Sequence, residues 1–129
     1  MKLFVDVDDT LILYYEKHTW DLSQTATYDI NFDLITALEI WHKYYPETSI
    51  VIWSGTGAKW AEEIAQALFP HMPIAMTGSK FSFLRDIISV DDMAIDDRLQ
   101  ESRPYLKKFR KVFLPNEFVK HVEEVITNV

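Results

Sequence analysis

The sequence of 129 residues predicts an α/β fold, a doubly wound, Rossmann-like parallel sheet of about five strands with helices on both faces. Two observations predict it. Short apolar runs rich in Val and Ile, typical of strands buried on both faces, alternate with segments that have a helical period. Strands that alternate with helices are joined by right-handed crossovers and therefore run parallel. The length is typical of one domain, so we expect residues 1–129 to form a single domain.

Five apolar runs are the expected strands. They are short, bounded by polar or turn-forming residues, and too apolar to have one face in water. The runs are residues 2–6, 49–54, 73–77, 93–97 and 111–115.

Four segments have the apolar period of a helix. The clearest spans residues 31–45, where apolar side chains recur at i, i+4, i+7 and i+11 and Pro46 marks the end. We also expect a short helix within residues 102–109 that starts at Pro104, because proline is tolerated in a first turn. The other apolar stripes consist of Trp60, Ile64, Ala67 and Leu68; of Phe81, Leu84 and Ile88; and of Phe118, Val122, Val125 and Val129.

Residues 11–30 interrupt the alternation of strands and helices. They have no clean helical period and mix aromatic with polar side chains. We expect a loop or small hairpin here, a flap over the end of the first strand. Tyr14 and Trp20 in this segment could stack on a base or pack in the core, whereas Trp53 and Trp60 are expected in the core.

The composition excludes several classes of protein. With no cysteine, the chain has no disulfide, no thiolate metal site and no cysteine nucleophile. No apolar run reaches the length of about 18 residues that a membrane span needs, and Asp6 interrupts the apolar start too early for a signal peptide. We therefore expect a cytoplasmic protein that has no membrane partner. The net charge of −7 argues against a large nucleic-acid surface.

Five of the 20 acidic residues lie in two tight clusters at the ends of expected strands. Asp6, Asp8 and Asp9 follow the first strand, and Asp96 and Asp97 end the fourth. In a parallel sheet these strand ends lie at one edge, where ligands bind. Like charges this close repel one another, and bound divalent cations could neutralise part of the charge.

Further polar groups are expected at the same edge. The second strand ends at Ser54, before the glycine-containing turn that starts with Gly55, and Lys80 lies just past the third strand. Clustered carboxylates are typical ligands of Mg²⁺, while a hydroxyl, backbone N–H groups and a lysine can hold a phosphate group. Together they predict phosphoryl transfer.

These motifs resemble, in order, the four motifs of the haloacid dehalogenase (HAD) superfamily of phosphohydrolases. They are "FVDVDDTL", "IVIWSG", Lys80 and "MAIDD", and they extend over nearly the whole chain. The resemblance implies a HAD-like fold and a phosphatase that depends on Mg²⁺. At Asp9 the commonest pattern of the superfamily has glycine, and aspartate is a familiar variant there.

The resemblance also implies a role for each motif residue. Asp6 would be the nucleophile that forms an aspartyl phosphate, and Asp8 would protonate the leaving group and then activate water. Mg²⁺ would be held by Asp6, by the backbone carbonyl of Asp8 and by Asp96 or Asp97. Ser54, Gly55 and Lys80 would bind the phosphoryl oxygens, with Arg85 the rival of Lys80, and Thr10 would brace the loop.

The spacing of the motifs leaves no room for the large cap domain of many relatives, so we expect an open site. A capless chain with "MAIDDR" also has some similarity to the 3′-phosphatase domain of the bacteriophage polynucleotide kinases. The predicted substrate is a phosphorylated small molecule or a nucleotide, with a nucleic-acid 3′-phosphate as the second candidate. The further alternatives are a phospho-accepting signalling module and a non-catalytic protein of similar fold. The third expected strand ends without the aspartate that such a module phosphorylates, and the complete set of Asp6, Asp8, Ser54, Lys80 and Asp96 argues against a non-catalytic protein. The sequence predicts nothing about the oligomeric state.

Overall fold

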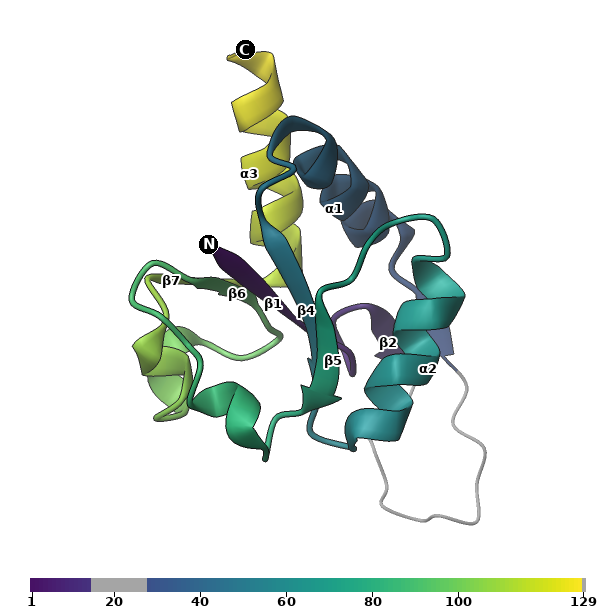
Figure 1. Ribbon diagram of the computed structural model, residues 1–129. Helices are drawn as coiled ribbons and strands as arrows, with labels where there is room; N and C mark the ends of the chain where they lie inside the picture. The colour runs from purple at the N-terminus through teal and green to yellow at the C-terminus, as the bar shows by residue number, and fades with distance from the viewer. Residues whose placement is uncertain (15–27, 129) are drawn as a thin grey trace.

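The computed structural model describes residues 1–14 and 28–128, and its elements confirm the α/β class. Five parallel strands form one sheet in the order β5-β4-β1-β6-β7 (Figure 1). The chain adds strands on one side of β1 and then on the other, so the strand order changes direction beside β1, as in a Rossmann-like sheet. The strands are β1 (Lys2–Asp6), β4 (Ser49–Ser54), β5 (Met76–Ser79), β6 (Met93–Ile95) and β7 (Lys111–Phe113).

Local signals start the three α-helices of the described residues, α1 (Phe32–Tyr44), α2 (Ala58–Leu68) and α3 (Pro115–Thr127). The Asn31 side chain accepts a hydrogen bond from the backbone N–H of Leu34 and caps α1. Gly57 precedes α2 with φ of 142°, a conformation that favours glycine. Pro115 opens α3, and the Glu117 carboxylate accepts the backbone N–H of Leu114 at 3.0 Å.

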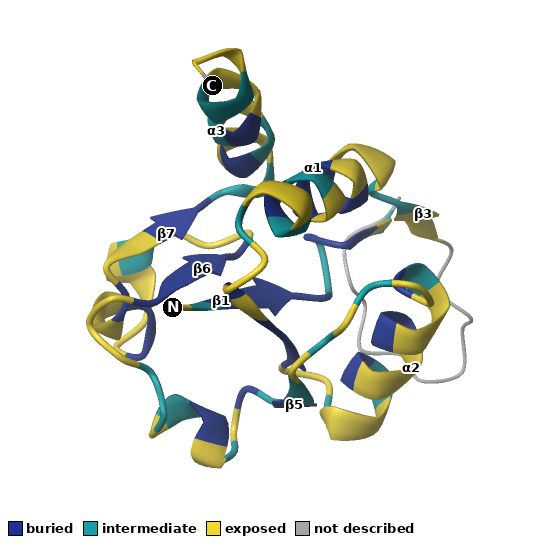
Figure 2. Ribbon diagram, turned by 45° about the horizontal axis from the view of Figure 1, so that its top comes forward, coloured by how far each residue is buried: buried dark blue, intermediate teal, exposed yellow. Residues whose placement is uncertain are grey.

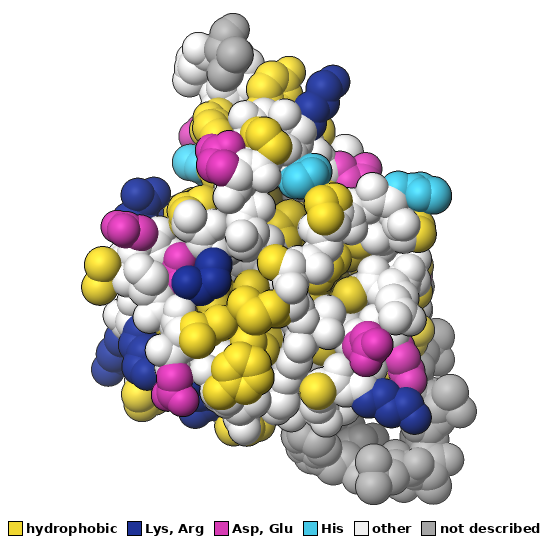
Figure 3. Space-filling model, viewed as in Figure 1, with side chains coloured by type: hydrophobic (Ala, Val, Ile, Leu, Met, Phe, Trp, Pro, Cys, Tyr) yellow, Lys and Arg dark blue, Asp and Glu magenta, His cyan; other side chains and the backbone are white. Residues whose placement is uncertain are grey.

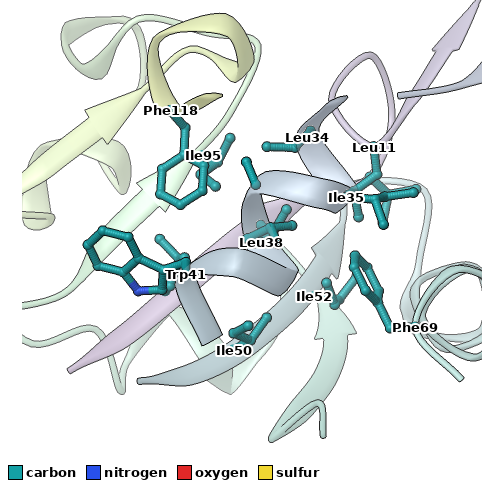
Figure 4. Packing of buried hydrophobic residues seen from close by; sticks show 14 of the residues in the cluster. Leu11, Leu34, Ile35, Leu38, Trp41, Ile50, Ile52, Phe69, Ile95 and Phe118 are labelled. Carbon is teal, nitrogen blue, oxygen red and sulfur yellow. The ribbon is translucent and has the colours of Figure 1, made fainter. Parts of the chain in front are cut away.

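The two faces of the sheet are covered by different kinds of helix. All three α-helices pack on one face, in a cluster that includes Leu38 and Trp41 of α1 and Phe118 of α3 (Figure 4). On this side the inward surfaces of α1, α2 and α3 are buried and their outward surfaces exposed (Figure 2). The other face packs Phe4 and Trp53 against the short 3-10 helices η1 (Phe83–Arg85) and η3 (Leu106–Lys108).

A small hairpin follows β1. β2 (Ile12–Tyr14) and β3 (Tyr28–Ile30) are antiparallel and form the two ends of the segment for which the sequence predicts a loop or hairpin. Residues 15–27, including Trp20, lie outside the described residues, so the prediction of a flap is not tested over its middle part.

The third strand lies further along the chain than predicted. The sequence predicts residues 73–77, whereas β5 spans Met76–Ser79. Gly78 and Ser79 are poor strand residues on their own. They become part of the strand because they pair with Trp53 and Ser54 at the end of β4.

The helix predicted from Phe81, Leu84 and Ile88 is wrong, because the segment forms only η1. Phe81 is 73% exposed whereas Leu84 is buried, so the three apolar side chains do not share one buried helical face. Serine hydroxyls accept the backbone N–H groups here, that of Ser79 from Phe81 and that of Ser82 from Leu84. Such local bonds favour turns over a continued helix.

Smaller differences concern three other helices. Within residues 102–109 the short helix is η3, which starts after Pro104 and is preceded by another 3-10 helix, η2 (Gln100–Ser102). In α2 the buried residues are Ala61, Ile64 and Ala65, so Ile64 is buried as predicted, whereas Ala67 is exposed. Phe118 and Val122 of α3 are buried as predicted. No helix among the described residues is long and apolar enough to cross a bilayer.

Candidate functional site

The predicted site residues lie at the carboxyl edge of the sheet. β1 ends at Asp6 and β4 at Ser54, Lys80 follows β5 directly, and Asp96 and Asp97 follow β6. Because these four strands are parallel neighbours, their ends meet at one edge (Figure 1). Four segments that are far apart in the sequence therefore contribute to one place.

Lys80 joins two of the acidic strand ends. Its Nζ atom lies 2.8 Å from Asp6 Oδ1 and 2.8 Å from Asp96 Oδ2, and all three residues are buried. Burial alone would lower the pKa of Lys80, but the charges of Asp6 and Asp96 outweigh it and raise the pKa. Lys80 is therefore a charged ammonium held between two carboxylates.

Arg85, the rival of Lys80 in the sequence, occupies a different position. Its Nε donates to the backbone carbonyl of Lys80. Its guanidinium lies 4.7 Å from the ring centroid of Phe81 and 4.3 Å from that of Tyr105. Arg85 thus contacts the backbone beside the site, whereas the Lys80 side chain contacts the carboxylates.

Asp6, Asp96 and Asp97 form a cluster that fits a divalent cation. One carboxylate oxygen from each lies within 4.8 Å of the others. With Lys80 the four side chains carry a net charge of about −2 when all are ionised, and all the acidic donors are the hard oxygens that Mg²⁺ prefers. Burial raises the pKa of Asp6, although Lys80 opposes this, and burial also raises the pKa of Asp97. A bound divalent cation would reduce the repulsion among these three carboxylates.

The loop after β1 is held by its own backbone and by Thr10. The backbone N–H groups of Thr10 and the two residues after it donate to the carbonyl of Val7. The Thr10 hydroxyl donates to Asp6 Oδ2 at 2.9 Å. Asp9 has φ of 60°, a left-handed conformation that aspartate tolerates better than most residues. Thr10 therefore fixes the carboxylate of Asp6 as well as the loop.

Asp8 stands apart from this cluster and has its own set of partners. Among the described residues, four side-chain groups donate hydrogen bonds to its carboxylate. Burial would raise the pKa of Asp8, but these four hydrogen bonds outweigh it and lower the pKa. The donors are the Tyr14 hydroxyl (2.7 Å) and Trp60 Nε1 (3.1 Å) to Oδ1, and the hydroxyls of Ser54 (3.0 Å) and Thr56 (2.9 Å) to Oδ2.

The turn after β4 contributes the rest of the predicted phosphate-binding group. Ser54 is fully buried, and its hydroxyl also accepts the backbone N–H of Thr56 at 3.0 Å. Gly55 lies exposed beside it. A methyl group on Gly55 would meet only the far edge of the Phe81 ring, at 3.8 Å. The turn is thus open to solvent at Gly55, next to a buried hydroxyl.

Sequence reasoning missed the contacts of Asp8 with Thr56 and Trp60. Thr56 lies within the turn that the sequence singles out and was a detectable candidate for the site. Trp60 is only half-buried, and its N–H points to Asp8, whereas the helical period predicts a core residue. Trp53 is fully buried in the core as predicted.

Comparisons of the chain with protein-family models, with curated proteins and with solved structures gave no match in any of the three.

Proposed function

We propose that this protein is a phosphomonoester hydrolase of the HAD type that depends on Mg²⁺ and has no large cap. One observation carries the proposal: the Lys80 ammonium bridges Asp6 and Asp96, with Asp97 beside them. Asp8 lies two residues after the expected nucleophile. Carboxylates for a cation, a fixed lysine and a serine hydroxyl beside an exposed turn are the groups that phosphoryl transfer needs.

In the proposed reaction, an oxygen of Asp6 attacks phosphorus and forms an aspartyl phosphate while the bond from phosphorus to the ester oxygen breaks. Asp8 takes up the proton that a phosphomonoester monoanion brings and gives it to that leaving oxygen. Water then attacks phosphorus, Asp8 takes a proton from the water, and phosphate leaves as Asp6 is restored. The four donors around Asp8 favour its ionised form, which suits the water-activating step directly.

Asp6, Asp96 and Asp97 would hold Mg²⁺, together with the backbone carbonyl of Asp8 that the resemblance implies. When bound, the cation would neutralise charge on the phosphoryl group. Ser54, the backbone N–H of Gly55 and Lys80 would bind phosphoryl oxygens. The net charge and the exposed turn suit a phosphorylated small molecule or a nucleotide better than a long nucleic acid.

The proposal is tested by the hydrolysis of 4-nitrophenyl phosphate in Mg²⁺ and in excess chelator. We expect turnover only with the cation, and none with Asp6→Asn, because this change removes the nucleophilic charge and keeps the shape of the side chain. Asp91→Asn is the matched control, since Asp91 is exposed and precedes β6 at the opposite edge of the sheet. Full activity in chelator, or in Asp6→Asn, would contradict the proposal.

A further inference from the structure

The two oxygens of Asp8 are bound by chemically different groups. Oδ1 accepts the Tyr14 hydroxyl and the Trp60 indole N–H, at 2.7 and 3.1 Å. Oδ2 accepts two aliphatic hydroxyls, those of Ser54 and Thr56, at 3.0 and 2.9 Å. A carboxylate accepts about four hydrogen bonds, so both oxygens are saturated. Asp8 can exchange a proton only if one of these four bonds is given up.

The hydroxyls on Oδ2 are the pair that can turn away. An aliphatic hydroxyl rotates about its C–O bond and finds a new acceptor without moving the backbone. Ser54 ends β4 and Thr56 lies in the turn that follows, where the proposed function places the phosphoryl oxygens. A bound phosphoryl group therefore offers these two hydroxyls new acceptors and releases Oδ2.

Of the donors on Oδ1, the Trp60 N–H cannot turn away, and the ring that carries the Tyr14 hydroxyl is held by its neighbours. An indole N–H points in one direction fixed by its ring and has no other rotamer for the proton. The Trp60 ring meets Tyr28 edge to face at 6.3 Å, and Tyr28 meets Tyr14 at 6.0 Å in the same manner. Trp60 comes from α2, while Tyr14 and Tyr28 pair across the hairpin of β2 and β3. Two separate elements thus fix Oδ1.

We propose that Tyr14 and Trp60 are positioning residues that anchor Oδ1 of Asp8, so that Oδ2 is the oxygen that carries the proton. This inference rests on the proposed function. Once released, Oδ2 takes up the proton that a phosphomonoester monoanion brings, and it passes this proton to the leaving oxygen as the bond from phosphorus to that oxygen breaks. Oδ2 then takes a proton from the attacking water, while Oδ1 keeps its two donors throughout.

The experiment compares two substrates whose leaving groups differ in how much they need to be protonated. The leaving group of 4-nitrophenyl phosphate departs with little protonation, whereas that of an alkyl phosphate such as ethyl phosphate requires it. For Trp60→Phe and Tyr14→Phe we expect kcat on ethyl phosphate to fall at least about tenfold, a part of the ~10²–10⁴-fold that acid–base catalysis supplies. On 4-nitrophenyl phosphate kcat should fall less than about threefold. KM should stay unchanged for both, since neither residue touches the phosphoryl group.

Tyr28→Phe is the matched control. It keeps the ring that meets Trp60 and Tyr14, and it removes a hydroxyl that does not bond to Asp8. It should leave both rates unchanged. An equal loss on both substrates in Trp60→Phe and Tyr14→Phe, or no loss on either, would overturn the positioning role.

A second measurement does not depend on activity. The ¹⁵N–¹H signal of the Trp60 indole is assigned by its disappearance in Trp60→Phe. It should shift in Asp8→Asn and not in Asp91→Asn, because only the first change removes the charged acceptor. An unshifted signal would overturn the anchoring contact. The two results can also separate. If the signal shifts in Asp8→Asn but the wild-type protein hydrolyses neither substrate, the contact is supported, while the proposed function and the catalytic role inferred for the two residues are rejected.

Discussion

At the scale of single residues, Lys80 supplies the buried positive charge of the candidate site. It is the cation between two buried carboxylates, and the cost of burying all three charges is offset only while they remain together. Lys2 offers a contrast, since it lies 3.0 Å from buried Asp92 but is itself partly exposed. Asp92 also accepts the backbone N–H groups of Lys2 and Ser89, so it keeps partners without the Lys2 ammonium.

Lys80→Met should therefore destabilise the fold strongly in the absence of a divalent cation. We expect the free energy of unfolding to fall by about 3 kcal/mol or more, because two carboxylates lose their buried counter-ion. Lys2→Met should lower it by less than about 1 kcal/mol. Urea unfolding at neutral pH with chelator present measures both changes. Equal losses in the two variants would show that the buried ion pairs of Lys80 contribute no more than the pair formed by the partly exposed Lys2.

At the scale of the elements, β5 and η1 fit together only because residue 78 is glycine. A methyl group at Gly78 would lie 2.5 Å from Leu84 Cδ1 and 3.4 Å from its Cγ. Leu84 is fully buried in the cluster beneath η1 and cannot move aside without disturbing its neighbours. This contact holds Lys80, which lies between the two elements, at its place by the site.

Gly78→Ala should therefore lower the free energy of unfolding by about 1–3 kcal/mol, the usual effect of overpacking. In a Leu84→Ala background, which removes the clashing atoms, the same change should have little further effect. Gly55→Ala is the control, because its new methyl group would make only an ordinary contact. Thermal or urea unfolding of the four variants measures this coupling. A Gly78→Ala loss that is unchanged by Leu84→Ala would refute the steric explanation.

At the scale of the whole molecule, the sheet brings like charges together at one edge. Figure 3 shows Lys and Arg mixed with Asp and Glu on the face it presents, so on the described part of that face the charge is dispersed. Asp6, Asp96 and Asp97 differ because the topology of the sheet places them side by side. The stability of the molecule should therefore depend on the protonation of this edge and on divalent cations.

The sign of the pH dependence follows from the raised pKa values of Asp6 and Asp97. A carboxyl group with a raised pKa in the folded state contributes stability that is complete below its unfolded pKa, about 3.9, and is lost as the pH rises through the folded pKa. Asp8 has the opposite effect because its pKa is lowered. Its contribution to the free energy of unfolding is present above about pH 4 and is lost as the pH falls below that value.

In chelator, the free energy of unfolding should therefore decrease as the pH rises above about 4, and Asp6→Asn should remove much of this slope. Mg²⁺ should restore stability at neutral pH, by about 2.7 kcal/mol at 100 times its Kd, since it binds only the folded chain. Urea unfolding over a pH series, with and without Mg²⁺, measures both effects. Identical pH profiles for the wild type and Asp6→Asn would contradict the assignment of the slope to this cluster.

The sequence by itself determined the fold class and most of the residues that form the candidate site. Apolar runs and helical periods are local patterns, and they predict strands that alternate with helices. Because parallel strands end at one edge, the position of a polar residue at a strand end is enough to predict where it lies. Asp6, Ser54, Lys80 and Asp96 were located in this way, without knowledge of any contact between them.

Only the tertiary structure decided which side chains meet. Lys80 rather than Arg85 reaches the carboxylates because η1 turns after Ser82, where hydroxyl bonds to the backbone replace the predicted helix. Trp60 bonds to Asp8 because α2 is rotated so that Ala61 is fully buried while Trp60 packs at the margin of the core, half-buried. Such contacts depend on the packing angles and exact ends of elements far apart in the chain, and no local pattern of residues contains these quantities.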